Sequence, residues 1–90
     1  MKITFRIHAI QRMFERSIGV EDIINVIQYG EAIESYPDDL PYPSRLLLGW
    51  HGKRPLHVVA ADNHGEDEII IITVYEPDPS QWDIEFKVRM

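Results

Sequence analysis

The chain of 90 residues contains no cysteine. Disulfide bridges, zinc sites with thiolate ligands and cysteine nucleophiles are therefore excluded, and the composition suits the reducing cytoplasm. No apolar run approaches the roughly 20 residues that a membrane-spanning helix needs. The first ten residues also lack the apolar stretch of a signal peptide. These absences predict a soluble protein of the cytoplasm that has no contact with the membrane.

Several signatures of ligand binding are missing as well. The sequence has no glycine-rich phosphate loop and no GxSxG turn around a serine nucleophile. Its four histidines lack the spacing of a metal site, so no metal and no cofactor is expected. The net charge of −6 argues against general binding to nucleic acid, because such binding depends on a basic surface that contacts phosphates. A role with nucleic acid would need a local basic cluster.

The periodicity of the N-terminal third is helical. Ile7, Ile10, Met13 and Phe14 recur at steps of three and four residues and define one apolar stripe, which predicts a helix with that stripe buried. The segment 17–19 interrupts this pattern. A second helix then follows over residues 20–29, with Gly19 as its N-cap and Gly30 where a left-handed C-cap residue belongs.

After residue 30 the apolar pattern changes to a period of two, which indicates strands. The loop at 37–44 holds three prolines and separates the first two of four predicted strands, at 31–36, 45–51, 55–62 and 68–75. The last of these is apolar on both faces, so it is expected in the interior of the sheet. Residues 1–7 fit a short strand or an extended lead-in, and residues 83–90 either close the sheet or form an extended tail. The fold class is α+β, with one domain over residues 1–90: two N-terminal helices packed on a four- to five-stranded antiparallel sheet.

Four motifs in order resemble a bacterial family known as a domain of unknown function, number 4258. They are HAxxRMxxR, YPDDxPYPSRLLLGW, PLHVVAA and ITVYEPDPSQW, and together they span nearly the whole chain. This family is grouped with the RelE-like ribonuclease toxins, within the barnase–EndoU–colicin superfamily. The resemblance implies a RelE-like fold and metal-independent cleavage of RNA. It also implies a toxin–antitoxin pair whose antitoxin commonly carries a zinc-finger domain, without direct contact between the toxin and DNA.

The first candidate site lies on the predicted N-terminal helix. His8, Arg12 and Arg16 stand at i, i+4 and i+8 and therefore form a row on the side opposite Ile10 and Phe14. Guanidinium groups match phosphate oxygens two at a time, and histidine carries protons near neutral pH. The row is therefore a candidate phosphate grip, although an ordinary solvated helix face explains it equally well.

The second candidate set lies on the predicted sheet. His57 stands between Leu56 and Val58, where a polar side chain is unusual, and it is either a core histidine bonded to Tyr75 or Thr73 or part of a site. In the functional interpretation, His57, Thr73 and Tyr75, with Arg45 as a possible fourth member, share the side of the sheet without helices.

Metal-independent RNA cleavage needs a base for the 2′-hydroxyl, an acid for the leaving 5′-oxygen and a cation for the phosphorane-like charge. The predicted catalytic residues are His57, Tyr75, Thr73 and His8, and the predicted phosphate-binding residues are Arg12, Arg16 and Arg45. The sequence thus predicts an endoribonuclease toxin acting on RNA and held by an antitoxin. The alternative is a partner-binding module of the same fold without catalysis, which the acidic net charge favours.

Overall fold

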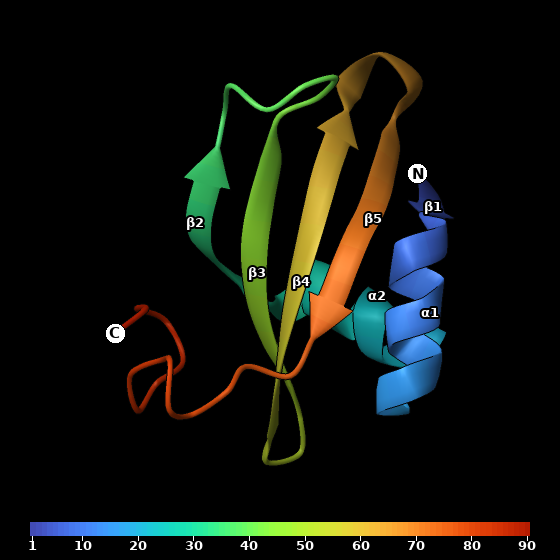
Figure 1. The fold of residues 1–90 in the computed structure, drawn as a ribbon. Helices are drawn as coiled ribbons and strands as arrows, with labels where there is room; N and C mark the ends of the chain where they lie inside the picture. Colours follow the sequence, from blue (N-terminus) through green and yellow to red (C-terminus); the bar gives the residue numbers. More distant parts are fainter.

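The computed structural model describes residues 1–90 and consists of two helices packed on a five-stranded mixed sheet (Figure 1). The elements in chain order are β1 (Lys2–Phe5), α1 (Ile7–Arg16), α2 (Val20–Tyr29), β2 (Glu31–Tyr36), β3 (Ser44–His51), β4 (Arg54–Asn63), the 3₁₀ turn η1 (His64–Glu66) and β5 (Glu68–Tyr75). The predicted α+β class, the two N-terminal helices and the four later strands are confirmed.

The expectation of a fully antiparallel sheet is wrong. The strand order is β1-β5-β4-β3-β2, and β1 pairs with β5 in parallel, whereas the other neighbours are antiparallel. The helices carry the chain from one edge of the sheet to the other, and the meander from β2 to β5 then brings it back beside β1. Parallel neighbours need a long connection, and here everything from α1 to β4 serves as that connection.

β5 lies between β1 and β4, as its two-faced apolar pattern predicts, and Ile70 and Ile71 on its two faces are both buried. The last residues, 77–90, neither close the sheet nor form a simple extended tail. They make a series of turns that runs across the lower end of the sheet in Figure 1 and contains one isolated bridge, between Trp82 and Arg89. The Asp83 carboxylate holds one turn by accepting bonds from the backbone N–H groups of Lys87 and Val88.

The main core lies between the helices and one face of the sheet, which we call the helix-covered face. Ile23 and Val26 of α2 pack there with Leu56, Val58 and other apolar side chains of the strands. A Cβ at Gly49 would stand 2.5 Å from Cγ2 of Val26, so this glycine lets α2 approach β3 closely.

Gly19 is the N-cap of α2, as predicted, but Gly30 is not left-handed: its φ of −72° is that of extended backbone. A side chain is excluded at Gly30 for another reason, since its Cβ would lie 2.4 Å from the carbonyl oxygen of Val26. The chain therefore passes from α2 directly into β2.

The predicted orientation of α1 is wrong in one respect. Ala9 and Met13 are its buried residues, whereas Ile10 and Phe14 are 53% and 89% exposed. The small Ala9 side chain lets the helix axis come close to β5. At about 100° per residue, the stripe of Ile10 and Phe14 lies on one side of the buried residues Ala9 and Met13, and the cationic row lies on the other side. Neither helix is long and apolar enough to cross a membrane.

Candidate functional site

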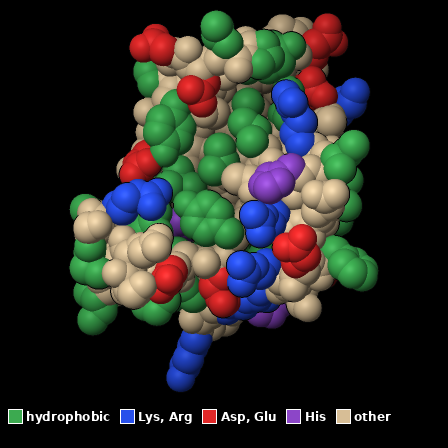
Figure 2. Space-filling model, in the orientation of Figure 1, with side chains coloured by type: hydrophobic (Ala, Val, Ile, Leu, Met, Phe, Trp, Pro, Cys, Tyr) green, Lys and Arg blue, Asp and Glu red, His purple; other side chains and the backbone are tan.

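A cavity of about 390 Å³ lies where α1 meets the open face of the sheet, the face without helices. Figure 2 shows His, Lys and Arg side chains in a column near the middle of this face, to the right of a patch of hydrophobic side chains. The lining residues come from three parts of the chain: His8, Arg12 and Arg16 of α1; Thr73 and Tyr75 of β5; and Glu76, Asp78, Gln81, Trp82 and Arg89 of the C-terminal segment. Five of the seven predicted site residues therefore line one cavity.

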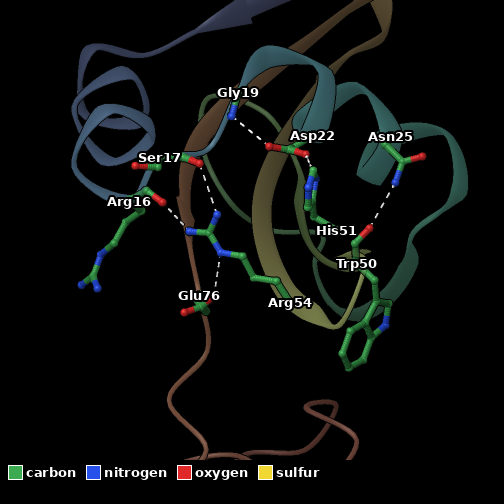
Figure 3. Close-up of polar contacts among 9 residues, drawn as sticks. All are labelled: Arg16, Ser17, Gly19, Asp22, Asn25, Trp50, His51, Arg54 and Glu76. Atoms are coloured by element: carbon green, nitrogen blue, oxygen red, sulfur yellow. Dashed lines mark hydrogen bonds and ion pairs between the residues drawn. The ribbon is translucent and has the colours of Figure 1, made fainter.

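The row on α1 owes its position to the way that the helix is anchored. The guanidinium of Arg54 on β4 donates to the backbone carbonyls of Arg16 and Ser17, the latter at 3.2 Å, and to the carboxylate of Glu76 at 2.7 Å. Figure 3 shows these contacts, with the Arg16 side chain pointing away from Arg54. Arg54 thus satisfies carbonyls that the end of the helix leaves free and fixes this end beside β5.

Cations and anions at the cavity are unevenly paired. Arg12 lies 3.4 Å from Glu15, whereas Arg16 and Arg89 have no carboxylate within ion-pair distance. The two acids of the lining already have partners, because Glu76 binds Arg54 and Asp78 accepts bonds from the backbone and hydroxyl of Ser80. The cavity therefore presents free guanidinium groups in a protein whose net charge is −6.

Tyr75 forms the back of the cavity and connects it to His57. The two residues face each other across β4 and β5, and the Tyr75 hydroxyl lies 3.1 Å from Nδ1 of His57. On the other side of the ring, Nε2 lies 2.8 Å from the backbone carbonyl of Phe86. A carbonyl oxygen only accepts, so Nε2 carries the proton of the neutral ring, and Nδ1 accepts from the Tyr75 hydroxyl.

His57 itself has no exposed surface, since the indole of Trp82 covers it edge-on with ring centroids 4.5 Å apart. Burial lowers the pKa of His57 below its ordinary value of 6.5, because the charged form loses its water. Burial also raises the pKa of the Tyr75 hydroxyl, and the nearby positive charge of Arg89 opposes that rise. At neutral pH the pair is an uncharged tyrosine that donates to an uncharged histidine.

Arg45 is not brought to this cavity. The strand register pairs Arg45 with Ala60 and His57 with Leu48, so Arg45 lies on the helix-covered face, opposite His57. There it forms an ion pair with Asp62 at 3.3 Å. The alternation along β3 already separates Arg45 from Leu46 and Leu48, but the sequence alone does not say which of the two sets faces the helices.

Trp82 and Arg89 belong to the site but are absent from the sequence-based prediction. Trp82 is 2% exposed, and the guanidinium carbon of Arg89 lies 4.6 Å from the centre of its ring. No periodicity marks the C-terminal segment as part of a site, because its position depends on turns and on contacts with the sheet. The other tryptophan, Trp50, lines a different cavity of about 540 Å³ at the end of α2.

The cavity offers positive charge from its arginines, hydrogen bonds from its hydroxyl groups, and the hydrogen-bonded pair of Tyr75 and His57, which can carry a proton. No group of three or more histidine, aspartate or glutamate side chains lies close enough together to hold a metal ion. The arrangement is suited to an anion placed between the arginines and the Tyr75 hydroxyl, since guanidinium groups form paired bonds to phosphate oxygens.

Comparison with known proteins gives one match. No curated protein and no solved structure matches the chain. One family model, described as a domain of unknown function (DUF4258), matches residues 5–76. This range includes α1, α2 and the sheet from β2 to β5, and it ends before the C-terminal segment. The chain therefore belongs to the DUF4258 family.

Proposed function

We propose that this protein is a RelE-like toxin of a toxin–antitoxin pair and acts in the cytoplasm as a metal-independent endoribonuclease. One observation carries the proposal: the cationic row of α1 and Tyr75, whose hydroxyl is bonded to His57, line the same cavity. Cleavage of RNA by its own 2′-hydroxyl needs a cation at the phosphate and proton transfer at both oxygens. Arg12 and Arg16 supply the first requirement in this proposal.

The proton transfers follow from the hydrogen bonds of Tyr75. The Tyr75 oxygen accepts the proton of the attacking 2′-hydroxyl while the Tyr75 hydroxyl proton passes to Nδ1 of His57. The bond between the 2′-oxygen and phosphorus forms, the bond from phosphorus to the 5′-oxygen breaks, and a protonated His8 gives its proton to that 5′-oxygen. The products are a 2′,3′-cyclic phosphate and a free 5′-hydroxyl. Thr73 donates a further hydrogen bond to the phosphate.

This scheme revises the direct role of His57 as acid or base. Its ring is enclosed, and the Phe86 carbonyl accepts from Nε2, so substrate meets Tyr75 rather than His57. The imidazolium formed during the reaction is held by the same carbonyl. The low pKa of His57 favours the reset after cleavage, in which Nδ1 returns its proton to the Tyr75 oxygen while the Tyr75 hydroxyl releases its own proton to solvent water.

The experiment is cleavage of an end-labelled single-stranded RNA by the purified protein, with and without EDTA. The wild type is expected to give 2′,3′-cyclic phosphate ends at the same rate in both conditions. Tyr75→Phe keeps the ring but removes the hydroxyl, and we expect the rate to fall by roughly 10²–10⁴. Lys53→Gln, at an exposed cation outside the cavity, is the control and keeps the wild-type rate. Absence of cleavage by the folded wild type refutes the proposal.

A second candidate function is a non-catalytic module that binds a protein partner. The specific observation in its favour is the exposed apolar stripe of α1, formed by Ile7, Ile10 and Phe14. Such a stripe is typical of a helix that packs on another protein. This candidate predicts that Phe14→Glu weakens the complex with the protein partner, while Tyr75→Phe leaves that complex unchanged.

A further inference from the structure

The C-terminal segment, residues 77–90, lies outside the family match at residues 5–76 but is fixed firmly to the fold. Trp82 is buried over His57, and the Phe86 carbonyl accepts from the same ring. Lys87 forms an ion pair with Glu31 of β2 at 3.2 Å. The Met90 N–H donates to the Gln81 carbonyl at 2.9 Å, next to the bridge between Trp82 and Arg89. These contacts set the backbone of Arg89 in a defined place.

The side chain of Arg89 is oriented as well. Its guanidinium stacks over the indole of Trp82 at 4.6 Å and has no carboxylate partner. Stacking uses the face of the guanidinium and leaves the N–H donors in its plane available, and the Tyr75 hydroxyl lies close enough to be one of their partners. The cavity lies on this free side, since Arg89 and Trp82 both line it together with Tyr75 and Arg16.

We propose that Arg89 is a second anion-binding arm of this site, which grips a phosphodiester of single-stranded RNA opposite the arginines of α1. Trp82 is its positioning residue, because the indole holds the guanidinium plane toward the cavity. The inference rests on the proposed function for the identity of the ligand. It assigns substrate binding to a segment that lies beyond residues 5–76, the range of the family match.

The test separates binding from cleavage by using a probe that cannot be cut, a fluorescein-labelled 2′-O-methyl hexauridylate. Binding is measured by fluorescence anisotropy over a series of salt concentrations. Arg89→Gln is expected to weaken binding at least tenfold and to reduce the slope of log K against log salt by about 0.7, the value for one phosphate contact on a single strand. Arg6→Gln removes an exposed, unpaired arginine outside the cavity and is the matched control.

A second readout reports the geometry without any RNA. The charge of Arg89 opposes the burial that raises the Tyr75 pKa. Arg89→Gln should therefore move the Tyr75 titration to higher pH, as followed by NMR of ring-labelled tyrosine, whereas Arg6→Gln should not. Arg89→Lys keeps the positive charge but loses the planar guanidinium with its paired N–H donors. We expect this variant to have the wild-type Tyr75 titration but a lower affinity for the probe than the wild type.

The outcomes distinguish this inference from the proposed function. Binding that depends on Arg89, without cleavage of unmodified RNA, supports the anion-binding arm and refutes the ribonuclease. Cleavage by the wild type with unchanged binding and rate in Arg89→Gln supports the ribonuclease and overturns the arm. A wild type that does not bind the probe at low salt overturns the arm, as does equal loss of affinity in Arg89→Gln and Arg6→Gln.

Discussion

Replacement of Trp82 by alanine tests the way in which the C-terminal segment is attached. The side chain is 2% exposed and lies between the ring of His57 and the guanidinium of Arg89. Truncation of a buried tryptophan costs roughly 3–5 kcal/mol in the free energy of unfolding. The whole stability of a domain of 90 residues is on the order of 5–14 kcal/mol. Trp82→Ala should therefore remove a large share of the stability.

The structure also sets an upper limit to this loss. The segment follows the last strand, so it can detach while the helix-covered core stays intact. The loss of unfolding free energy in Trp82→Ala therefore cannot exceed the free energy that attaches the segment to the sheet. A chain ending at residue 76 lacks the whole segment, so its free energy of unfolding should be equal to that of Trp82→Ala or slightly lower. Trp50→Ala is the control, since Trp50 is 43% exposed and its truncation should cost clearly less than that of Trp82.

The assay combines urea denaturation, followed by far-UV circular dichroism, with NMR titration of His57. Loss of the indole gives water access to the His57 ring, so its lowered pKa should rise toward 6.5 in Trp82→Ala and stay low in Trp50→Ala. The reasoning is refuted if Trp82→Ala loses less than about 1 kcal/mol, well under the range for a buried aromatic residue. An unchanged His57 titration in that variant would refute it as well.

Three further predictions follow from other contacts. The His57 pKa is lowered in the folded state, so the unfolded chain binds a proton first as the pH falls. The contribution of His57 to the free energy of unfolding should be constant above pH 6.5 and decrease below it. The difference between the urea midpoints at pH 7.5 and pH 5.5 should therefore be smaller in His57→Gln than in the wild type. Arg16→Gln should lower the rate of RNA cleavage by roughly 10²–10³, as for other charge-stabilising donors, with little change in the thermal midpoint, whereas equal rates would remove Arg16 from the site. Gly49→Ala should cost about 1–3 kcal/mol, because its Cβ would stand 2.5 Å from Cγ2 of Val26, and Val26→Ala should relieve part of that cost in the double variant.

Local patterns in the sequence were sufficient for the elements and for part of the site. The two helices, the joint before Gly19 and the interior position of β5 follow from periodicity, which depends only on neighbouring residues. The row of His8, Arg12 and Arg16 follows from helical geometry alone. The shared face of His57 and Tyr75 follows from the alternation of strands, once the two strands are neighbours.

The tertiary structure decided what those patterns leave open. The apolar stripe of α1 is exposed because the helix packs through Ala9 and Met13, and no local rule selects that side. The parallel pairing of β1 depends on where the whole meander returns. The cavity itself joins α1, β5 and the C-terminal segment, which are far apart in the chain, and Arg89 reaches it only through the burial of Trp82. Contacts between distant segments are set by the packing of the entire domain. For that reason the sequence predicts many of the residues of this site but not that they line one cavity.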